Sequence, residues 1–400
     1  MKHIITAFMA AVALCASAND APEAKNDSTG GFIFTDVKTI KTTAVRDQNK
    51  SGTCWCFSTN SFVEDEILRI ADKEVNISEM FTVRKCYKDK AVNYVRMYGI
   101  ANFAAGGGVI DIPYVWKRYG AVPEEVYTGL QYGEEKHVHG ELDGVLRGMV
   151  EAVKSKPNRR LSTAWLDAID GVLDAYMGEI PATFEVDGKT YTPESYAASL
   201  PYNPDDYVAI TSFSHHPFYD EFVLEVPDNW MWQRFLNVPL EEMKAVVDNA
   251  VENGFPIAWG ADVSEGGFNW NKGYAVMPVP TDAASLEGTE LARWVKLSDK
   301  ERQNKQFDIN GPCEEIVVTQ ESRQEMFDRQ ETTDDHGMEI VGYATDQDGN
   351  RFYKVKNSWD TNQVYGGYLY VSEAFLMAKT MNIYVHKDAL PKALRKKLKL

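Results

Sequence analysis

QNKSGTCWCFS, residues 48–58, is the stretch that decides the fold. Apolar residues recur at helical spacing from Cys54 to about Ala71 and predict a helix that starts at this cysteine. A helix N-terminus favours negative charge, so it lowers the pKa of a thiol placed there and raises its thiolate fraction. Gln48, six residues upstream, carries an amide that can face a developing oxyanion, with the backbone N–H of Cys54 as a second donor. The stretch predicts a nucleophile for acyl transfer.

A base for this thiol is found near the other end of the chain. His336 leads into a strand, and Asn357 and Trp359 end the next one. A hairpin between the two strands would place Asn357 Oδ1 where it accepts a hydrogen bond from the imidazole and fixes its tautomer. Trp359 would shield that bond from water. Cys54 and His336 are 282 residues apart, and His336 and Asn357 are 21 residues apart.

Periodicity places helices in the first part of the chain and strands in the last part. Helices are expected over residues 54–71, after the turn at 76–79, and over 111–118, 141–154, 163–177 and 240–253. Strands are expected over residues 256–259, 339–344, 351–356 and 367–371, with Asp348-Gly349 as a turn. This order predicts an α+β fold with an antiparallel sheet.

These motifs together resemble the papain-like cysteine peptidases. The order Gln, Cys-Trp, His and Asn-Ser-Trp matches that family, and Gly106-Gly107 matches its substrate-binding strip. The resemblance implies a two-lobed fold, with Cys54 on a helical lobe and with His336 and Asn357 on a β lobe. It also implies that the second glycine of the pair hydrogen-bonds the substrate main chain. No metal or organic cofactor is needed for such chemistry.

The long spacing between Cys54 and His336 points to one branch of that family. Ordinary papain-like enzymes separate these residues by about 130–150 positions, so roughly as many are inserted here. The chain is similar to the bleomycin hydrolase or aminopeptidase C type, on the following stretches: residues 107–123, 216–219, 237–239 and 385–387. The resemblance implies a thiol aminopeptidase, with Cys54 as nucleophile, His336 as general base and acid, Asn357 as orienter and Gln48 as oxyanion donor.

Four segments flank or interrupt the peptidase region of residues 32–390. Residues 1–18 read as a secretory signal peptide, with a basic start, a short apolar run and Ala16-Ser17-Ala18 at its end. Residues 19–31 read as a flexible leader, a mostly helical insertion is expected over about 124–240, and residues 391–400 form a basic tail. The protein is therefore expected in the periplasm or outside the cell; acylation at Cys15 is a weaker alternative, because Leu14 is bulky.

Composition excludes several classes of protein. The 59 Asp and Glu against 42 Lys and Arg give a net charge of −17, which argues against nucleic-acid binding. After residue 18 no apolar run is long enough to span a membrane. Five cysteines are too few for a disulfide scaffold in 400 residues. Whether Cys56, Cys86 and Cys313 form a disulfide is left open, with Cys56 expected to point into the helix packing.

Three departures from the family pattern leave the exact activity open. Ser51 stands where many secreted relatives have a disulfide cysteine, and Asp360 replaces the usual glycine after Asn-Ser-Trp. About a dozen residues follow Lys387, whereas the branch usually extends a longer arm whose carboxylate pairs with the substrate amine. An endopeptidase of the same fold, acyl transfer to an amine and a non-catalytic peptide-binding protein therefore stay as alternatives. The branch commonly forms hexamers, so homo-oligomerisation is also expected; side-chain preference and natural substrate stay open.

Overall fold

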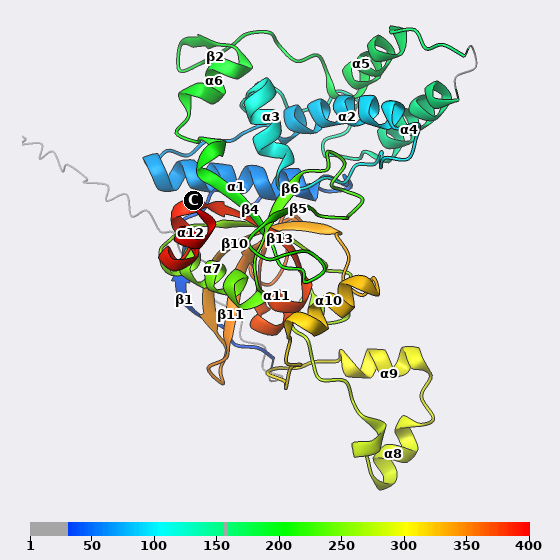
Figure 1. Cartoon of the computed structure of the whole chain (residues 1–400), viewed down its shortest axis with the longest axis vertical. Helices are drawn as coiled ribbons and strands as arrows, with labels where there is room; N and C mark the ends of the chain where they lie inside the picture. The colour runs from blue at the N-terminus through cyan, green and yellow to red at the C-terminus, as the bar shows by residue number, and fades with distance from the viewer. Residues whose placement is uncertain (1–30, 156–158) are drawn as a thin grey trace, which may run out of the picture.

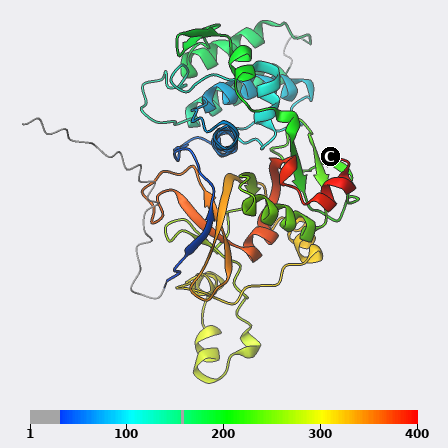
Figure 2. The ribbon, with the colours of Figure 1, turned by 90° about the vertical axis from the view of Figure 1, so that its left-hand side faces the viewer.

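The computed structural model describes residues 31–155 and 159–400. Helix α1 (Cys54–Ala71) lies between a helical half and a half built on a large sheet (Figure 1). Figure 2 shows this helix end-on, with the other helices of its half above it and the sheet below. The two lobes expected from the sequence are both present. The signal peptide and nearly all of the flexible leader lie outside the described residues.

Helix α1 is unusually buried, because both halves of the molecule pack against it. Phe62, Val63 and Ile67 are fully buried, and so are the polar residues Asp65 and Glu66. The helix has the bounds that periodicity predicts. It ends because Asp72 takes a left-handed conformation with φ of 50°, after which the chain cannot continue the helix.

The helical half packs around a single apolar cluster that includes the inner face of α1. Its elements are α2 (Glu79–Arg96), α3 (Asp111–Tyr119), α4 (Gly140–Lys154), α5 (Ala164–Met177), the hairpin β2 (Phe184–Val186) and β3 (Lys189–Tyr191), and α6 (Pro193–Ser199). Ser78 caps α2 by accepting a hydrogen bond from Phe81 N, as the turn at residues 76–79 indicates. Helices α4 and α5 confirm the helical windows expected there.

The second half is built on one large sheet with the strand order β5-β6-β4-β13-β7-β10-β11-β12-β9-β8, to which β1 adds along β10. Its strands are β1 (Thr35–Thr39), β4 (Tyr207–Thr211), β5 (Glu221–Val223), β6 (Arg234–Asn237), β7 (Ile257–Ala261), β8 (Phe268–Asn269), β9 (Tyr274–Ala275), β10 (His336–Thr345), β11 (Arg351–Lys356), β12 (Tyr368–Ser372) and β13 (Thr380–His386). All pairs are antiparallel except β4 with β6 and β9 with β12. The four strands expected near the end of the chain are confirmed.

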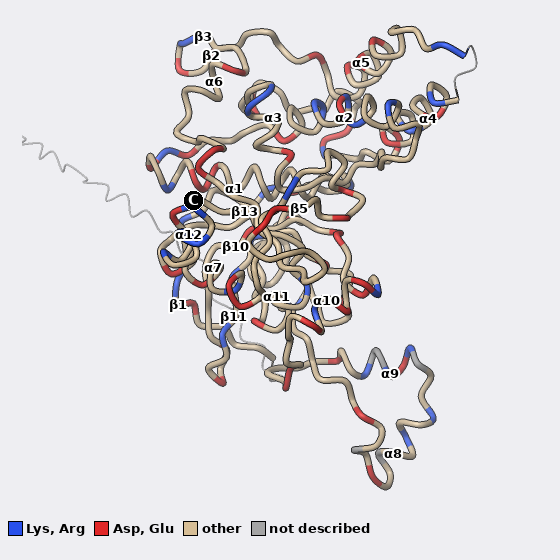
Figure 3. Tube along the Cα trace, in the orientation of Figure 1, with Lys and Arg blue, Asp and Glu red and all other residues tan. Residues whose placement is uncertain are grey.

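Helices cover the sheet and extend from it. They are α7 (Leu240–Glu252), α8 (Gly288–Trp294), α9 (Asp299–Gln306), α10 (Gln320–Asp328), α11 (Glu373–Lys379) and α12 (Lys392–Leu398), with short 3-10 turns at residues 204–206, 283–285 and 387–389. Helices α8 and α9 project from the far end of the molecule (Figure 1), and the sequence analysis did not predict them. The basic tail forms α12, while acidic positions are spread over both halves (Figure 3). Among the described residues, no helix combines the length and apolarity that a membrane span requires.

The segment at residues 124–240 contains more than helices. Its last part supplies β4, β5 and β6, which extend the large sheet beyond β13. Ile210 pairs with Ile383, so this segment is joined to the sheet by main-chain hydrogen bonds. These strands have only three to five residues each, which is too short for a clear pattern in the sequence.

A buried ionic network joins α1 to the strands that carry the late motifs. Lys356 Nζ lies 3.3 Å from Asp65 Oδ2 and 3.9 Å from Glu339 Oε2. Ser61 of α1 donates to Glu339 Oε2 at 2.7 Å, and Thr43 N donates to Asp65 Oδ1 at 2.6 Å. Burial raises the pKa of Glu339, and the neighbouring carboxylate of Asp65 adds to that rise. The lysine therefore compensates two carboxylates that are shielded from water.

Strand β10 approaches α1 very closely at Gly337. A methyl group on Gly337 would lie 2.6 Å from Ser58 Oγ and 3.0 Å from Trp55 Cα. Only a residue without a side chain permits this approach of β10 to the first turn of α1. The two elements that carry Cys54 and His336 meet here.

Replacing Lys356 by Met should destabilise the fold by about 3–5 kcal/mol, because two buried carboxylates lose their cation. Urea unfolding at neutral pH measures this. Lys73→Met is the matched control, because Lys73 is exposed and makes no described contact; its effect should stay within about 0.5 kcal/mol. Equal effects of the two substitutions would contradict a structural role for the network.

Replacing Gly337 by Ala should cost about 1–3 kcal/mol, because the added methyl group overpacks the contact between β10 and α1. The reaction rate of Cys54 with an alkylating reagent should change as well, since its surroundings shift. Gly144→Ala is the control, because Gly144 lies in α4 with open space around its Cα. That control should leave the alkylation rate unchanged and stabilise slightly. Parallel behaviour of the two variants would argue against the close approach.

Candidate active site

Cys54 is the first residue of α1 and is partly exposed. Its Sγ lies 4.0 Å from the carbonyl oxygen of Asp335. Burial raises the pKa of the thiol to about 12, with a smaller contribution from the charges of Asp334 and Asp228, while hydrogen bonds from the backbone of Gly337 and Trp55 act in the opposite direction. The helix terminus alone does not produce a thiolate here, so the thiol needs a base to remove its proton.

His336 and Asn357 are brought together by the hairpin of β10 and β11. Strand β10 begins at His336 and β11 ends one residue before Asn357. His336 Nε2 lies 2.8 Å from Asn357 Oδ1, and the Trp359 ring lies 4.4 Å from the imidazole, measured between centroids. Within the described residues, the other ring nitrogen, Nδ1, has no hydrogen-bond partner. It is the atom left to accept a proton from a neighbouring group.

Burial lowers the pKa of His336 to about 4, although the hydrogen bond to Asn357 opposes that shift. The imidazole is therefore neutral at ordinary pH and can act as a base. Asn357 Oδ1 also accepts from Ser358 N at 2.8 Å, so the orientation of its amide is fixed from two sides. The arrangement holds one tautomer of His336 in place.

Gln48 is held rigidly beside the start of α1. Its Oε1 accepts from Ser358 Oγ at 2.7 Å, and its Nε2 donates to Ser51 O at 2.9 Å. These two bonds use one of the two amide hydrogens of Nε2, and the second has no partner among the described residues. Ser51, which replaces the expected cysteine, donates to Gln48 O at 2.8 Å and so supports the same turn.

Gly106 and Gly107 lie next to the first turn of α1. Trp55 Nε1 donates to Ala105 O at 2.9 Å, and a methyl group on Gly107 would come within 2.8 Å of the Trp55 ring. The buried Lys90 donates to the carbonyl oxygen of Gly106 from below. The glycine strip is thus fixed against the residue that follows Cys54, with its backbone partly exposed.

The remaining departures have simple structural outcomes. Asp360 takes a φ of 82°, a conformation that favours glycine, and its Oδ1 accepts from Asn362 N at 2.8 Å. Cys56 is fully buried and its Sγ donates to Glu79 O at 3.3 Å, as expected of a thiol that points into the helix packing. Cys54, Cys56, Cys86 and Cys313 are all free in the structure.

Two carboxylates near the thiol were not identified from the sequence. Asp228 comes from the segment without motifs, and a methyl group on Gly106 would collide with its carboxylate. Asp334 lies two residues before His336. Burial raises the pKa of Asp334 to about 8, and the charge of Asp228 is the next largest cause. The position of Asp334 directly before Asp335 and His336 could have indicated the second carboxylate. No feature of the sequence indicates Asp228.

Two other features lie outside this group of residues. His215, His216 and Glu225 have ligand atoms within 4.8 Å of one another, and this is the one group in residues 31–155 and 159–400 that could hold a metal ion. Glu225 already lies 2.8 Å from His216 Nε2 and 3.1 Å from His215 Nε2, so its carboxylate contacts both imidazoles directly.

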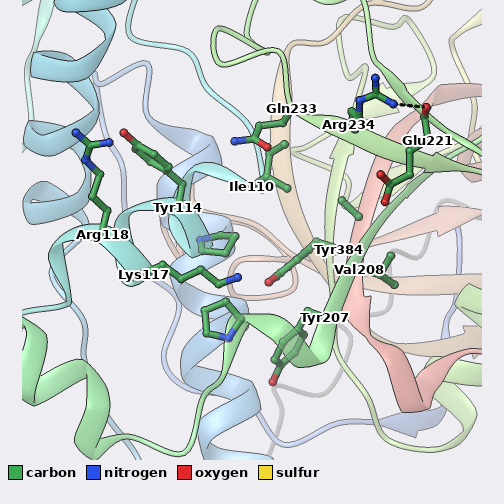
Figure 4. Close-up of a pocket in the computed structure, with 13 residues that line it drawn as sticks. Ile110, Tyr114, Lys117, Arg118, Tyr207, Val208, Glu221, Gln233, Arg234 and Tyr384 are labelled. Carbon is green, nitrogen blue, oxygen red and sulfur yellow. Dashed lines mark hydrogen bonds between the residues drawn. The ribbon is translucent and has the colours of Figure 1, made fainter. Parts of the chain in front are cut away.

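A cavity of about 530 Å³ opens between α3 and strands β4, β6 and β13 (Figure 4), and no sequence-predicted site residue lines it.

Two models of protein families match the chain. The model described as "Papain family cysteine protease" matches residues 34–160, and the model described as "Peptidase C1-like family" matches residues 302–400. The first range contains Gln48, Cys54 and the glycine pair, and the second contains His336 and Asn357. The segment between the two ranges, with Asp228, is matched by neither.

Curated relatives and a solved structure cover most of the chain. Aminopeptidase C of Lactobacillus delbrueckii subsp. lactis is 22% identical over 400 residues, which span 89% of this chain and 82% of the relative. Aminopeptidase G of the same organism is 24% identical over 397 residues, with coverage of 88% and 83%. The crystal structure of pepw from Lactobacillus rhamnosis HN001 matches with a TM-score of 0.65 at 20% identity, over 91% of this chain and 84% of that chain. That likeness shows a shared fold. The chain is a cysteine-type peptidase with a papain-like fold, and it is similar to the aminopeptidase C type.

Proposed function

We propose that the protein is an exported aminopeptidase that hydrolyses peptides through Cys54, His336 and Asn357. The observation that carries the proposal is the 2.8 Å contact of His336 Nε2 with Asn357 Oδ1, which leaves Nδ1 available beside the start of α1. Cys54 is the partly exposed thiol at that point, and its Sγ lies 4.0 Å from the carbonyl of the residue before His336. Peptide substrates follow from the family.

The reaction starts with transfer of the Sγ proton of Cys54 to His336 Nδ1. The sulfur attacks the peptide carbonyl carbon, and the oxyanion accepts hydrogen bonds from the backbone N–H of Cys54 and from Gln48 Nε2. The imidazolium gives its proton to the leaving amine as the C–N bond breaks, which leaves a thioester. His336 then takes a proton from water, the hydroxide displaces the sulfur, and Cys54 regains its proton.

Burial disfavours the thiolate and the imidazolium when each is considered alone. Proton transfer from the thiol to the imidazole creates both charges at once. Their mutual attraction in a site of low dielectric offsets part of the cost of removing each from water. Asn357 contributes because its oxygen stabilises the charged form of the ring.

Export and assembly are further parts of the proposal. The basic start and apolar run of residues 1–18 support export, and the N-terminal sequence of protein recovered from outside the cytoplasm should begin at Asn19. The resemblance to the bleomycin hydrolase type supports a homo-oligomer such as a hexamer. Size-exclusion chromatography with light scattering would refute this by giving a monomer.

Aminopeptidase action predicts a preference between two matched fluorogenic substrates. An aminoacyl amide with a free α-amine should be hydrolysed at least tenfold faster, by kcat/KM, than its N-acetylated form. Cys54→Ala should abolish both activities, because the acyl-enzyme cannot form. Preference for the acetylated substrate would favour the endopeptidase alternative, and amide products in the presence of an added amine would favour acyl transfer.

The pKa of His336 predicts where activity is lost in acid. Because burial lowers this pKa to about 4, the imidazole stays a free base above that pH and becomes protonated below it. The kcat/KM for an N-acetylated substrate, whose charge is constant, should therefore be level down to about pH 4 and then fall about tenfold per unit. Circular dichroism at each pH controls for unfolding. Loss of activity near pH 6.5, the ordinary value for histidine, would contradict the buried neutral base.

A further inference from the structure

Two carboxylates without a cation face the region beside the thiol. Asp228 packs against Gly106 of the glycine strip. Asp334 directly precedes Asp335, whose carbonyl oxygen lies 4.0 Å from Cys54 Sγ. Both charges act on the thiol, and Asp228 also acts on Asp334. They come from separate parts of the chain, the segment after β5 and the segment before β10. The fold therefore collects two carboxyl groups at the end of the substrate strip.

Hydrogen bonding separates these two carboxylates from others nearby. Asp111 accepts from Trp230 Nε1 and Gly108 N, and Asp262 accepts from Thr333 N and Ser264 N, so both are held by the protein itself. Asp228 accepts a single bond, at Oδ1 from Asn102 Nδ2 at 3.1 Å. Within residues 31–155 and 159–400, Asp334 has neither a hydrogen bond nor an ion pair. Three of the four oxygens of Asp228 and Asp334 are therefore available to a ligand.

Two neighbouring, partly buried carboxylates repel each other, so their arrangement is unfavourable unless a cation lies between them. Burial, and after it the charge of Asp228, raise the pKa of Asp334 to about 8, and burial also raises the pKa of Asp228. The buried Lys90 acts on Asp228, but its amine donates to the carbonyls of Ala104 and Gly106 under the strip. The site thus favours a ligand that carries a positive charge.

The position of the substrate is fixed independently, because the carbonyl carbon that reacts must reach Cys54 Sγ. In a peptide attacked at its first bond, the α-nitrogen lies about 2.5 Å from that carbon. It is an ammonium group with three donors, which matches the carbonyl oxygen of Asp335 together with two carboxylates. A longer peptide bound through its interior would place a neutral amide at the same point.

We propose that Asp228 and Asp334 bind the α-ammonium group of the substrate and so restrict the enzyme to the first peptide bond. The inference rests on the proposed aminopeptidase function and names the groups that produce it. The C-terminal tail does not supply this contact in the described structure. Helix α12 lies against α7, where Lys397 Nζ is 3.2 Å from Glu242 Oε1 and stacks over the Tyr219 ring.

The test compares Asp228→Asn and Asp334→Asn with the unchanged enzyme on the same aminoacyl amide, free and N-acetylated. Each variant should lower kcat/KM for the free amine by roughly 10- to 100-fold, as expected when a charged hydrogen bond is lost. The loss should appear mainly in KM, and activity on the acetylated substrate should stay equal or rise. Asp220→Asn is the control, because Asp220 is an exposed aspartate directly before β5.

Labelling of Cys54 by an epoxide that attacks active thiols separates the possible failures. Labelled enzyme whose variants keep the wild-type ratio of the two activities would overturn the ammonium site but leave the peptidase intact. Absence of labelling would overturn the proposed function as well. Faster cleavage of N-acetyl-Lys-Ala amide than of the free alanyl amide would assign the carboxylates to a basic side chain instead. If Asp334→Asn does not fold, as judged by circular dichroism, Asp228→Asn carries the test alone.

Discussion

The contact between β10 and the first turn of α1 is the constraint on which the rest of the structure depends. Gly337 lets the strand pass so close to Trp55 and Ser58 that the residue before it, His336, shares a region with Cys54. The apolar cluster of the helical half also takes in residues of the sheet, among them Ala258 and Tyr384, so the two halves share a packed interface. This contact, supported by Lys356 between two buried carboxylates, helps to fix one half relative to the other, together with hydrogen bonds such as those of Tyr207 with Glu66 and of Ser358 with Gln48.

The charges in the site follow from the same close packing. Removing the thiol and the imidazole from water favours their neutral forms, so the resting site holds a proton that moves only when a substrate arrives. Two carboxyl groups beside them, Asp228 and Asp334, form no ion pair within the described residues. An enzyme that binds a positively charged substrate end can use this arrangement, because the ammonium group compensates the carboxylates in the complex.

The sequence predicts the parts of the fold where pattern and chemistry coincide. Helix α1, the strands β7 and β10 to β12, and the meeting of His336 with Asn357 follow from periodicity and from the hairpin spacing. Helices α8 and α9 were missed because they contribute little to a core, and strands β4 to β6 were missed because each is too short to show a clear pattern. Asp228 could not be found at all. Its contacts depend on how the long segment that contains it packs against the glycine strip, and the local sequence does not indicate that packing.

The separation of the two halves of the site along the chain has a consequence for biosynthesis. A chain made only as far as residue 335 contains Cys54 but lacks His336, and β7 still lacks both of its sheet neighbours, β10 and β13. Closing a loop of 282 residues is a late and entropically costly step. Under the proposed mechanism, a nascent or incompletely folded molecule is therefore unable to cut peptides. The order of synthesis itself would delay proteolysis until the whole fold is in place.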